Sequence, residues 1–139
     1  MNIEVLMVAN GASVENSLLS VQGGGWEHYN PLFFPWTVRG AVAGIGTLEP
    51  SEVGSISIVD VEVSDQHGHV VQSVGSMTID ASRPAAKAGV PMRFPFFAPL
   101  MFVVTAPTVV KVALSSEGAE LAAVTFAVHD PVPDAPPSA

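Results

Sequence analysis

Turn-forming residues punctuate this chain about every ten residues, and the segments between them are rich in Val, Ile and other strand-forming side chains. No segment has the period of an amphipathic helix, and twelve glycines and twelve prolines interrupt the chain throughout. This pattern predicts an all-β fold: an antiparallel β-sandwich of about seven or eight strands, an Ig-like or C2-like Greek key with little or no helix.

The clearest predicted strand is 55–64, in which valines alternate with polar residues as in a half-buried sheet. The alternation slips between Ile58 and Val59, which indicates a β-bulge at that point. A hairpin turn at 65–68 is expected to join this strand to a partner at 69–79.

The remaining segments complete the expected sandwich. Asn10 and Gly11 favour a tight turn that would end the first strand. The proline-punctuated segment 81–99 is expected to be a long loop that crosses from one sheet to the other. Further strands are predicted at 3–9, 17–23, 37–48, 100–105, 108–115 and 120–128.

Composition limits the domain count and the compartment. At 139 residues we expect a single domain over 1–128, followed by a Pro-rich, disordered tail at 129–139. The chain has no cysteine, no basic leader-like start and no apolar run near the ~20 residues that span a bilayer. These features predict a cytoplasmic protein with no transmembrane segment.

Charge argues against nucleic acid as a partner, because the net charge is −8 and binding to phosphates needs a basic surface. Residues 81–116 are the exception, since they carry basic side chains and no acidic one. Arg83, Lys87 and Arg93 give the 81–93 loop the character of a basic contact surface for an acidic partner.

Aromatic side chains gather in two proline-flanked segments. In a core they would be ordinary packing, and on a surface they would mark an interface or a ligand site. The candidates are Trp26, Tyr29, Phe33, Phe34 and Trp36 in the first segment, and Phe96 and Phe97 in the second.

Residues with catalytic or metal-binding chemistry are sparse. Asp65, His67 and His69 have ligand-type side chains, but a solvated hairpin turn explains them more simply than a metal site does. Gly23, Gly24 and Gly25 lack the following helix that a phosphate loop needs. We therefore expect no catalytic residues and no cofactor.

Several segments together resemble a family of small bacterial proteins known only as a domain of unknown function. The resemblance implies one small β domain and supplies no activity or site. In the family pattern an Asp more often occupies the position of Asn10. The resemblance rests on segment 4–10, Gly23 to Trp26, Phe34-Pro35, Asp65 with Gly68, Pro99 with Phe102, Glu117-Gly118, and Phe126 with Val128.

These observations predict a non-catalytic binding or assembly module, a homo-oligomer or a protein that binds another protein through its aromatic loops and the basic 81–93 loop. One alternative is a small-ligand or carbohydrate-binding sandwich, with Trp26, Tyr29 and Trp36 as a stacking platform. The other is a metal-dependent enzyme that uses the 65–69 turn.

Overall fold

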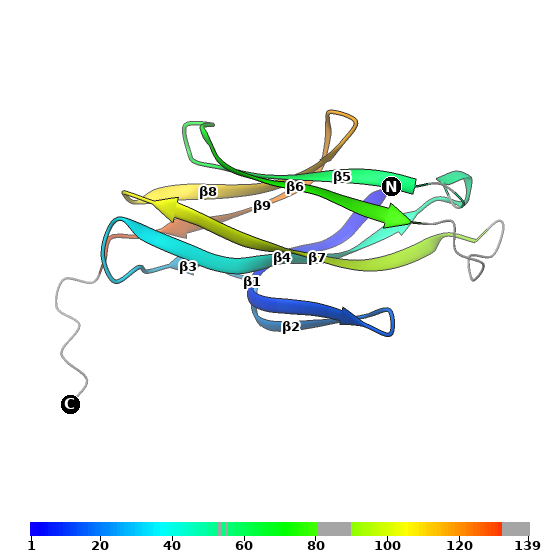
Figure 1. The fold of residues 1–139 in the computed structure, drawn as a ribbon, viewed down its shortest axis with the longest axis horizontal. Helices are drawn as coiled ribbons and strands as arrows, with labels where there is room; N and C mark the ends of the chain where they lie inside the picture. The colour runs from blue at the N-terminus through cyan, green and yellow to red at the C-terminus, as the bar shows by residue number, and fades with distance from the viewer. Residues whose placement is uncertain (53, 55, 81–89, 132–139) are drawn as a thin grey trace.

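The computed structural model describes residues 1–52, 54, 56–80 and 90–131, and over these ranges the chain is a two-layer β-sandwich (Figure 1). The only helical segment there is the short 3-10 turn η1 (Pro50–Glu52), and none of the described helices is long and apolar enough to cross a membrane. The strands are β1 (Asn2–Glu15), β2 (Leu18–Gly24), β3 (His28–Tyr29), β4 (Trp36–Leu48), β5 (Ile56–Ser64), β6 (Val70–Asp80), β7 (Met92–Val104), β8 (Thr108–Ser116) and β9 (Ala119–Val128).

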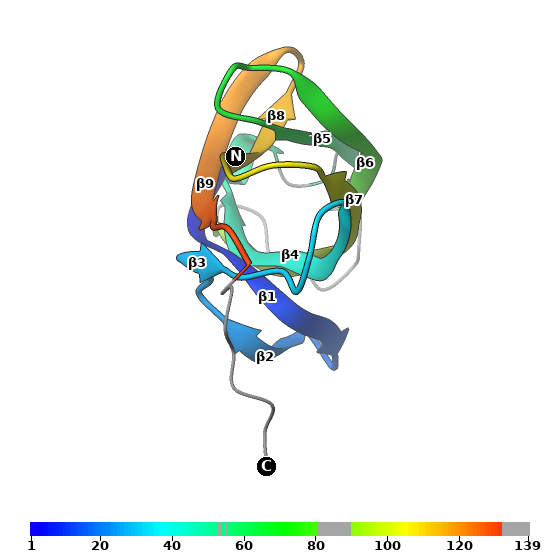
Figure 2. The same ribbon diagram turned by 90° about the vertical axis from the view of Figure 1, so that its left-hand side faces the viewer.

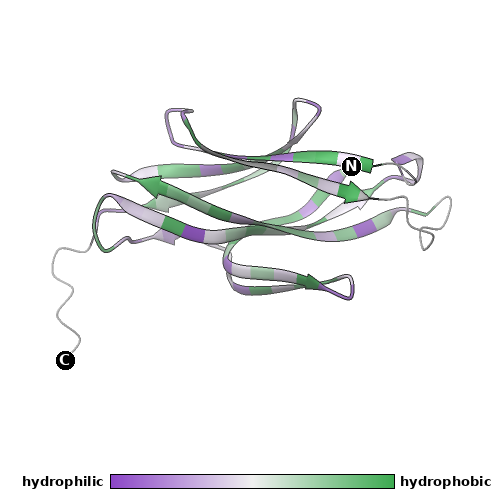
Figure 3. Ribbon diagram, viewed as in Figure 1, coloured by the Kyte–Doolittle hydropathy of each residue, from purple (hydrophilic) through white to green (hydrophobic). Residues whose placement is uncertain are grey.

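The strands form two sheets whose inner faces enclose one apolar core (Figure 2). One sheet has the order β2-β1-β4-β7 and the other has the order β3-β9-β8-β5-β6. Every pairing is antiparallel except that of the two-residue strand β3 with β9, which is parallel. The predicted all-β sandwich is thus confirmed, with hydrophobic stretches along the strands and polar residues at the protruding turns (Figure 3).

Large and small side chains interlock where β4 faces the core beside β7. Gly44 pairs with Phe96 and Gly46 pairs with Phe94, so each aromatic ring lies over a position that has no side chain. A Cβ atom added to Gly44 would stand 2.1 Å from the Val5 carbonyl oxygen and 2.6 Å from the Phe96 ring. Glycine is therefore required there, because both the backbone of β1 and a core ring occupy the space.

The prediction that Asn10 and Gly11 end the first strand is wrong. β1 continues through both residues, and the turn lies at Asn16 and Ser17, whose φ values of 52° and 60° suit a tight hairpin. The first half of β1 pairs with β4 and the second half pairs with β2. The β1–β2 hairpin consequently projects from the sandwich as an arm (Figure 1).

The prediction of a loop over 81–99 is wrong for its second part, because β7 begins at Met92 and includes Pro95 and Pro99. β7 is the edge strand of its sheet. Pro95 and Pro99 are four residues apart, so both prolines lack an N–H group on the same side of the strand. That side is the open edge, where no neighbouring strand needs the hydrogen bond. The chain does pass from one sheet to the other between β6 and β7, as expected, and residues 81–89 of this connection lie outside the described residues.

The expected bulge between Ile58 and Val59 is also wrong. The β5–β6 register is continuous there and shifts instead at Val61/Glu62 and Val63/Ser64. The alternation had seemed to slip because Ile58 is an apolar residue on the exposed face of β5, whereas Val59 faces the core.

The hairpin turn predicted at 65–68 is confirmed. Gly68 donates its N–H to the Asp65 carbonyl at 3.0 Å, and its φ of 78° requires the freedom of glycine. Glu117 and Gly118 have φ values of 53° and 79° and connect β8 to β9. From the predicted tail, His129, Asp130 and Pro131 are described, and 132–139 lie outside the described residues.

Candidate functional site

Trp26 fastens the base of the arm to the sandwich. Its indole Nε1 donates to the side-chain oxygen of Asn10 and to the Gly23 carbonyl, both at 3.0 Å. The ring meets Phe126 edge to face at 5.5 Å, which attaches the arm to the core. Gly23 has a φ of 58°, and a Cβ atom there would overlap Asn10. Residues that carried the family resemblance thus serve a structural junction here.

A second aromatic group borders a shallow pocket at the same end of the molecule. Trp36 Nε1 donates to the Tyr29 hydroxyl at 2.8 Å, and Phe33 meets the Trp36 ring edge to face at 4.9 Å. These contacts hold the three rings in fixed positions. The pocket has a volume of about 450 Å³ and is lined by Tyr29, Phe33, Pro35, Trp36, Thr37 and Arg39.

The outer face of β7 continues this pocket across the sheet. In the β4–β7 register Thr37 pairs with Val103, and Arg39 pairs with Met101. Directly opposed residues in antiparallel strands point to the same face, so the lining of the pocket and the outer face of β7 are contiguous. Met101 and Val103 are 51% and 53% exposed, and Phe33 is 60% exposed. We call Phe33, Arg39, Met101 and Val103 the β7 surface.

Arg39 gives the β7 surface a positive charge that pairs with no carboxylate of the described residues. Among the three basic side chains in the described ranges, Arg93 pairs with Glu4 at 2.8 Å and Lys111 pairs with Glu120 at 2.7 Å. Arg39 is exposed and forms no ion pair with any described carboxylate. A guanidinium amid exposed apolar side chains can bind a carboxylate from outside the molecule.

The predicted aromatic candidates divide between core and surface. Trp26, Tyr29, Phe34 and Trp36 are partly buried and pack against the core, and Phe96 is buried within it. Phe33 is exposed, and Phe97 is partly exposed on the outer face of β7. Of these seven, Phe33 and Phe97 are therefore the two that are exposed at the surface.

The basic 81–93 loop is not a uniform loop. Arg93 belongs to β7, and its ion pair with Glu4 engages it within the sheet. The pKa of Glu4 lies below its ordinary value, because the Thr47 hydroxyl and then Arg93 donate to the carboxylate. Arg83 and Lys87 lie outside the described residues.

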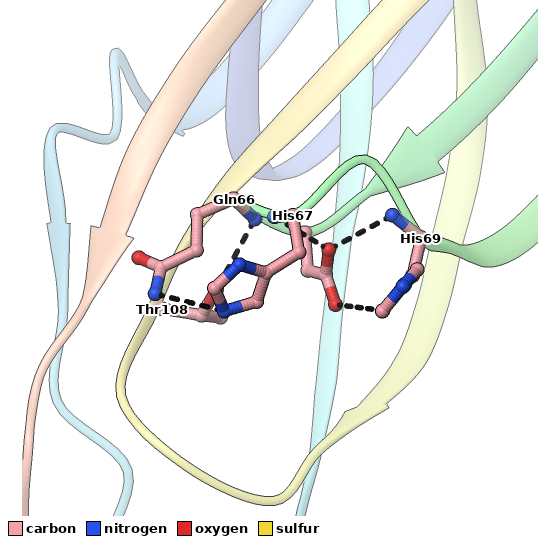
Figure 4. A network of polar contacts seen from close by, with 5 residues as sticks. Gln66, His67, His69 and Thr108 are labelled. Atoms are coloured by element: carbon pink, nitrogen blue, oxygen red, sulfur yellow. Dashed lines mark hydrogen bonds and ion pairs between the residues drawn. The ribbon is translucent and has the colours of Figure 1, made fainter.

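The 65–69 turn uses its carboxylate to hold the backbone (Figure 4). Asp65 Oδ1 accepts the N–H groups of His67 and His69, each at 2.9 Å, and Gln66 N–H donates to the Thr108 hydroxyl at 3.4 Å. Burial opposes ionisation of Asp65, but these backbone hydrogen bonds outweigh it and lower its pKa. Among the described residues no three His, Cys, Asp or Glu side chains converge as a metal site would require.

A histidine pair joins the end of β9 to β3. His28 Nδ1 lies 2.8 Å from His129 Nε2, and His129 N–H donates to the Tyr29 carbonyl at 3.0 Å. Both side chains are exposed. The pair explains how the short strand β3, and with it Tyr29, is held beside β9.

Sequence reasoning missed Arg39, Met101 and Val103. The sequence did contain one signal for Met101 and Val103. Both the odd-numbered and the even-numbered positions of 92–104 are mostly apolar, which is unusual for an edge strand with one solvated face. Arg39 could not be found in this way, because its position opposite Met101 depends on the register of two strands far apart in the sequence.

Comparison with known proteins adds no relative. No protein-family model, no curated protein and no solved structure matches this chain. The family resemblance therefore stays a prediction, and the functional argument depends on the geometry of the site.

Proposed function

We propose that this chain is a non-catalytic protein-binding module and that the β7 surface is where it docks. The observation that carries the proposal is the outer face of β7, which exposes Met101 and Val103 beside Arg39 and Phe33. Aromatic residues, Met and Arg are the side chains enriched in protein interfaces. Exposed apolar side chains lower solubility, and a binding role gives these residues a physical reason to be exposed.

Charge complementarity supports a partner with a carboxylate at the contact. The chain carries a net charge of −8, yet Arg39 forms no ion pair with a carboxylate of the described residues. An acidic group that approaches this surface would find a cation flanked by apolar side chains, where an ion pair is less screened than in open solvent. A second copy of the chain, which is itself acidic, satisfies this requirement as well as a different protein does.

The alternative of a carbohydrate platform has less support from the geometry. Trp26 and Trp36 are partly buried against the core, and both indole N–H groups donate within the protein. A stacking platform needs exposed ring faces, and Phe33 is the exposed ring of this region.

The test compares the wild-type chain with a chain that carries Met101→Ser and Val103→Ser. The matched control is Val109→Ser, which changes an exposed valine on β8 in the other sheet. Each protein is panned against a displayed peptide library, and its mass is measured by light scattering across a range of concentrations and salt.

We expect wild-type and Val109→Ser proteins to enrich the same binders or to form the same multiple of 14.4 kDa, and the double variant to lose them. A salt-sensitive association would implicate Arg39. The proposal is wrong if the wild-type protein enriches no binder and stays at 14.4 kDa at every concentration, or if the double variant binds as the wild type does.

A further inference from the structure

The pocket at the end of the β7 surface has rigid aromatic walls and one cation. Because Trp36 donates to the Tyr29 hydroxyl oxygen, that hydroxyl keeps its own hydrogen available for an incoming acceptor. Phe33 and Trp36 stand nearly perpendicular, with an interplanar angle of 85°, so the edge of one ring packs on the face of the other and both rings line the pocket. Arg39 lies at the other side of the same pocket.

This set of groups matches the chemistry of an extended proline-rich strand. Proline rings pack on aromatic faces, and the polyproline conformation exposes backbone carbonyls to donors such as a tyrosine hydroxyl. Such a peptide loses little conformational entropy on binding, so a shallow pocket can hold it. A compact helix would need a longer apolar groove than the six lining residues provide.

We propose that this pocket binds an extended proline-rich peptide of a partner protein, with an acidic side chain that pairs with Arg39. The inference rests on the proposed protein-binding function and names the kind of partner. Phe33, Trp36 and Pro35 contact the prolines, the Tyr29 hydroxyl donates to a peptide carbonyl, and the acidic side chain selects the orientation of the peptide.

Charge supports an acidic ligand over a neutral one. Arg39 is the basic residue of the described ranges without an acidic partner, and none of the described residues that line the pocket carries a carboxylate. An acidic peptide therefore completes an ion pair without displacing an existing one. Phosphate-bearing ligands are less well suited, since a single guanidinium and three aromatic rings offer few donors.

The probe is a synthetic peptide with the sequence of residues 129–139, which combines two Asp residues with prolines at 131, 133, 136 and 137. Matched peptides replace both Asp by Asn, or all prolines by alanine. Binding to the full chain is followed through the NMR signals of the two indole N–H groups. Trp36 borders the pocket, whereas Trp26 donates to Asn10 and Gly23 and serves as the internal control.

We expect the probe to shift the Trp36 signal more than the Trp26 signal. Loss of a charge-assisted contact should weaken binding about tenfold for the Asn peptide and for Arg39→Gln. The alanine peptide and the Phe33→Ala protein should bind far more weakly, while Lys111→Gln, whose lysine pairs with Glu120, should bind as the wild type does.

Absence of binding, equal binding of the alanine peptide, or equal shifts at both indoles would overturn the inference. The measurement is repeated with Pro133, Pro136 and Pro137 replaced by alanine in the protein, so that the chain's own copy of the sequence cannot compete. Binding seen only with that protein would identify the chain itself as the occupant and would overturn a partner peptide. Library binders that depend on Met101 and Val103 but lack proline would refute this inference and leave the proposed function standing.

Discussion

The two faces of β7 have similar residues and opposite surroundings. Phe96 and Phe102 on the inner face are buried, whereas Met101 and Val103 on the outer face are about half exposed. The inner side chains are fixed by the volume that the opposite sheet and the glycines of β4 leave for them. The outer side chains are as hydrophobic as the inner ones and still stay about half exposed, so hydrophobic composition by itself does not identify a core.

The largest expected difference between the faces comes from truncating neighbouring residues. Phe102→Ala should lower the free energy of unfolding by about 3–5 kcal/mol, because it leaves a cavity in the core. Val103→Ala should change it by less than about 0.5 kcal/mol, since the side chain is half exposed. Urea unfolding followed by tryptophan fluorescence measures both values, and a similar cost for the two variants would contradict the assignment of the faces.

Two glycine substitutions, one in β4 and one in β1, test how tightly the inner face of β7 is packed. Gly44→Ala should cost about 3 kcal/mol or more, because the new Cβ would overlap the Val5 carbonyl and the Phe96 ring. Gly11→Ala is the matched control in β1, where no atom lies within 4 Å of an added Cβ and φ is not left-handed. It should be neutral or stabilising by up to about 1 kcal/mol. Thermal unfolding of both variants checks this, and a tolerated Gly44→Ala would mean that β1 and β4 pack less closely.

The smallest expected effect is on a pKa, at the polar end of the outer face of the β1, β4 and β7 sheet. Arg93→Gln should raise the pKa of Glu4 toward 4.5, with the Thr47 hydrogen bond still holding part of the depression. A carboxylate with a lowered folded pKa stabilises the fold above its unfolded pKa, and this contribution disappears as the pH falls through the folded pKa. The variant should therefore show less loss of stability below about pH 4.5. An NMR titration of the Glu4 side chain measures the shift, Lys111→Gln is the control, and an unchanged pKa would show that the ion pair does not form in solution.

Much of the sandwich was predictable, because valines alternate with polar residues from Val59 to Ser64 in β5, and because β5 and β8 end at turns that contain aspartate or glycine. The start of β7 was not, since Pro95 and Pro99 usually interrupt a strand and are tolerated here only at an edge. The predicted turn at Asn10 and Gly11 was wrong because strand pairing again outweighed a local preference. Their local preference for a turn is overridden by the pairing of β1 with β4 on one side and with β2 on the other.

The candidate site was predictable only in part. The sequence pointed to an aromatic loop, and the exposed Phe33 lies there. It did not distinguish Phe33 from Trp26, because burial depends on where Phe126 and Gly40 stand in the folded chain. The proximity of Arg39 to Met101 depends on strand register, which a single sequence does not specify across an intervening stretch of other strands.

The arm described above has a consequence for how this domain can be cut or extended. β1 is shared, so a deletion that removes β2 would leave the second half of β1 with a bare row of N–H and C=O groups. Bare strand edges recruit other chains, and such a fragment would aggregate where the whole domain does not. The tip at Asn16 and Ser17 is exposed, and it borders one pocket together with Met92 and Arg93 at the start of β7. A linker inserted at that tip would leave the pairing of β1 with β4 intact, and it would leave the domain beside the Met92 end of β7, nine residues along the strand from Met101.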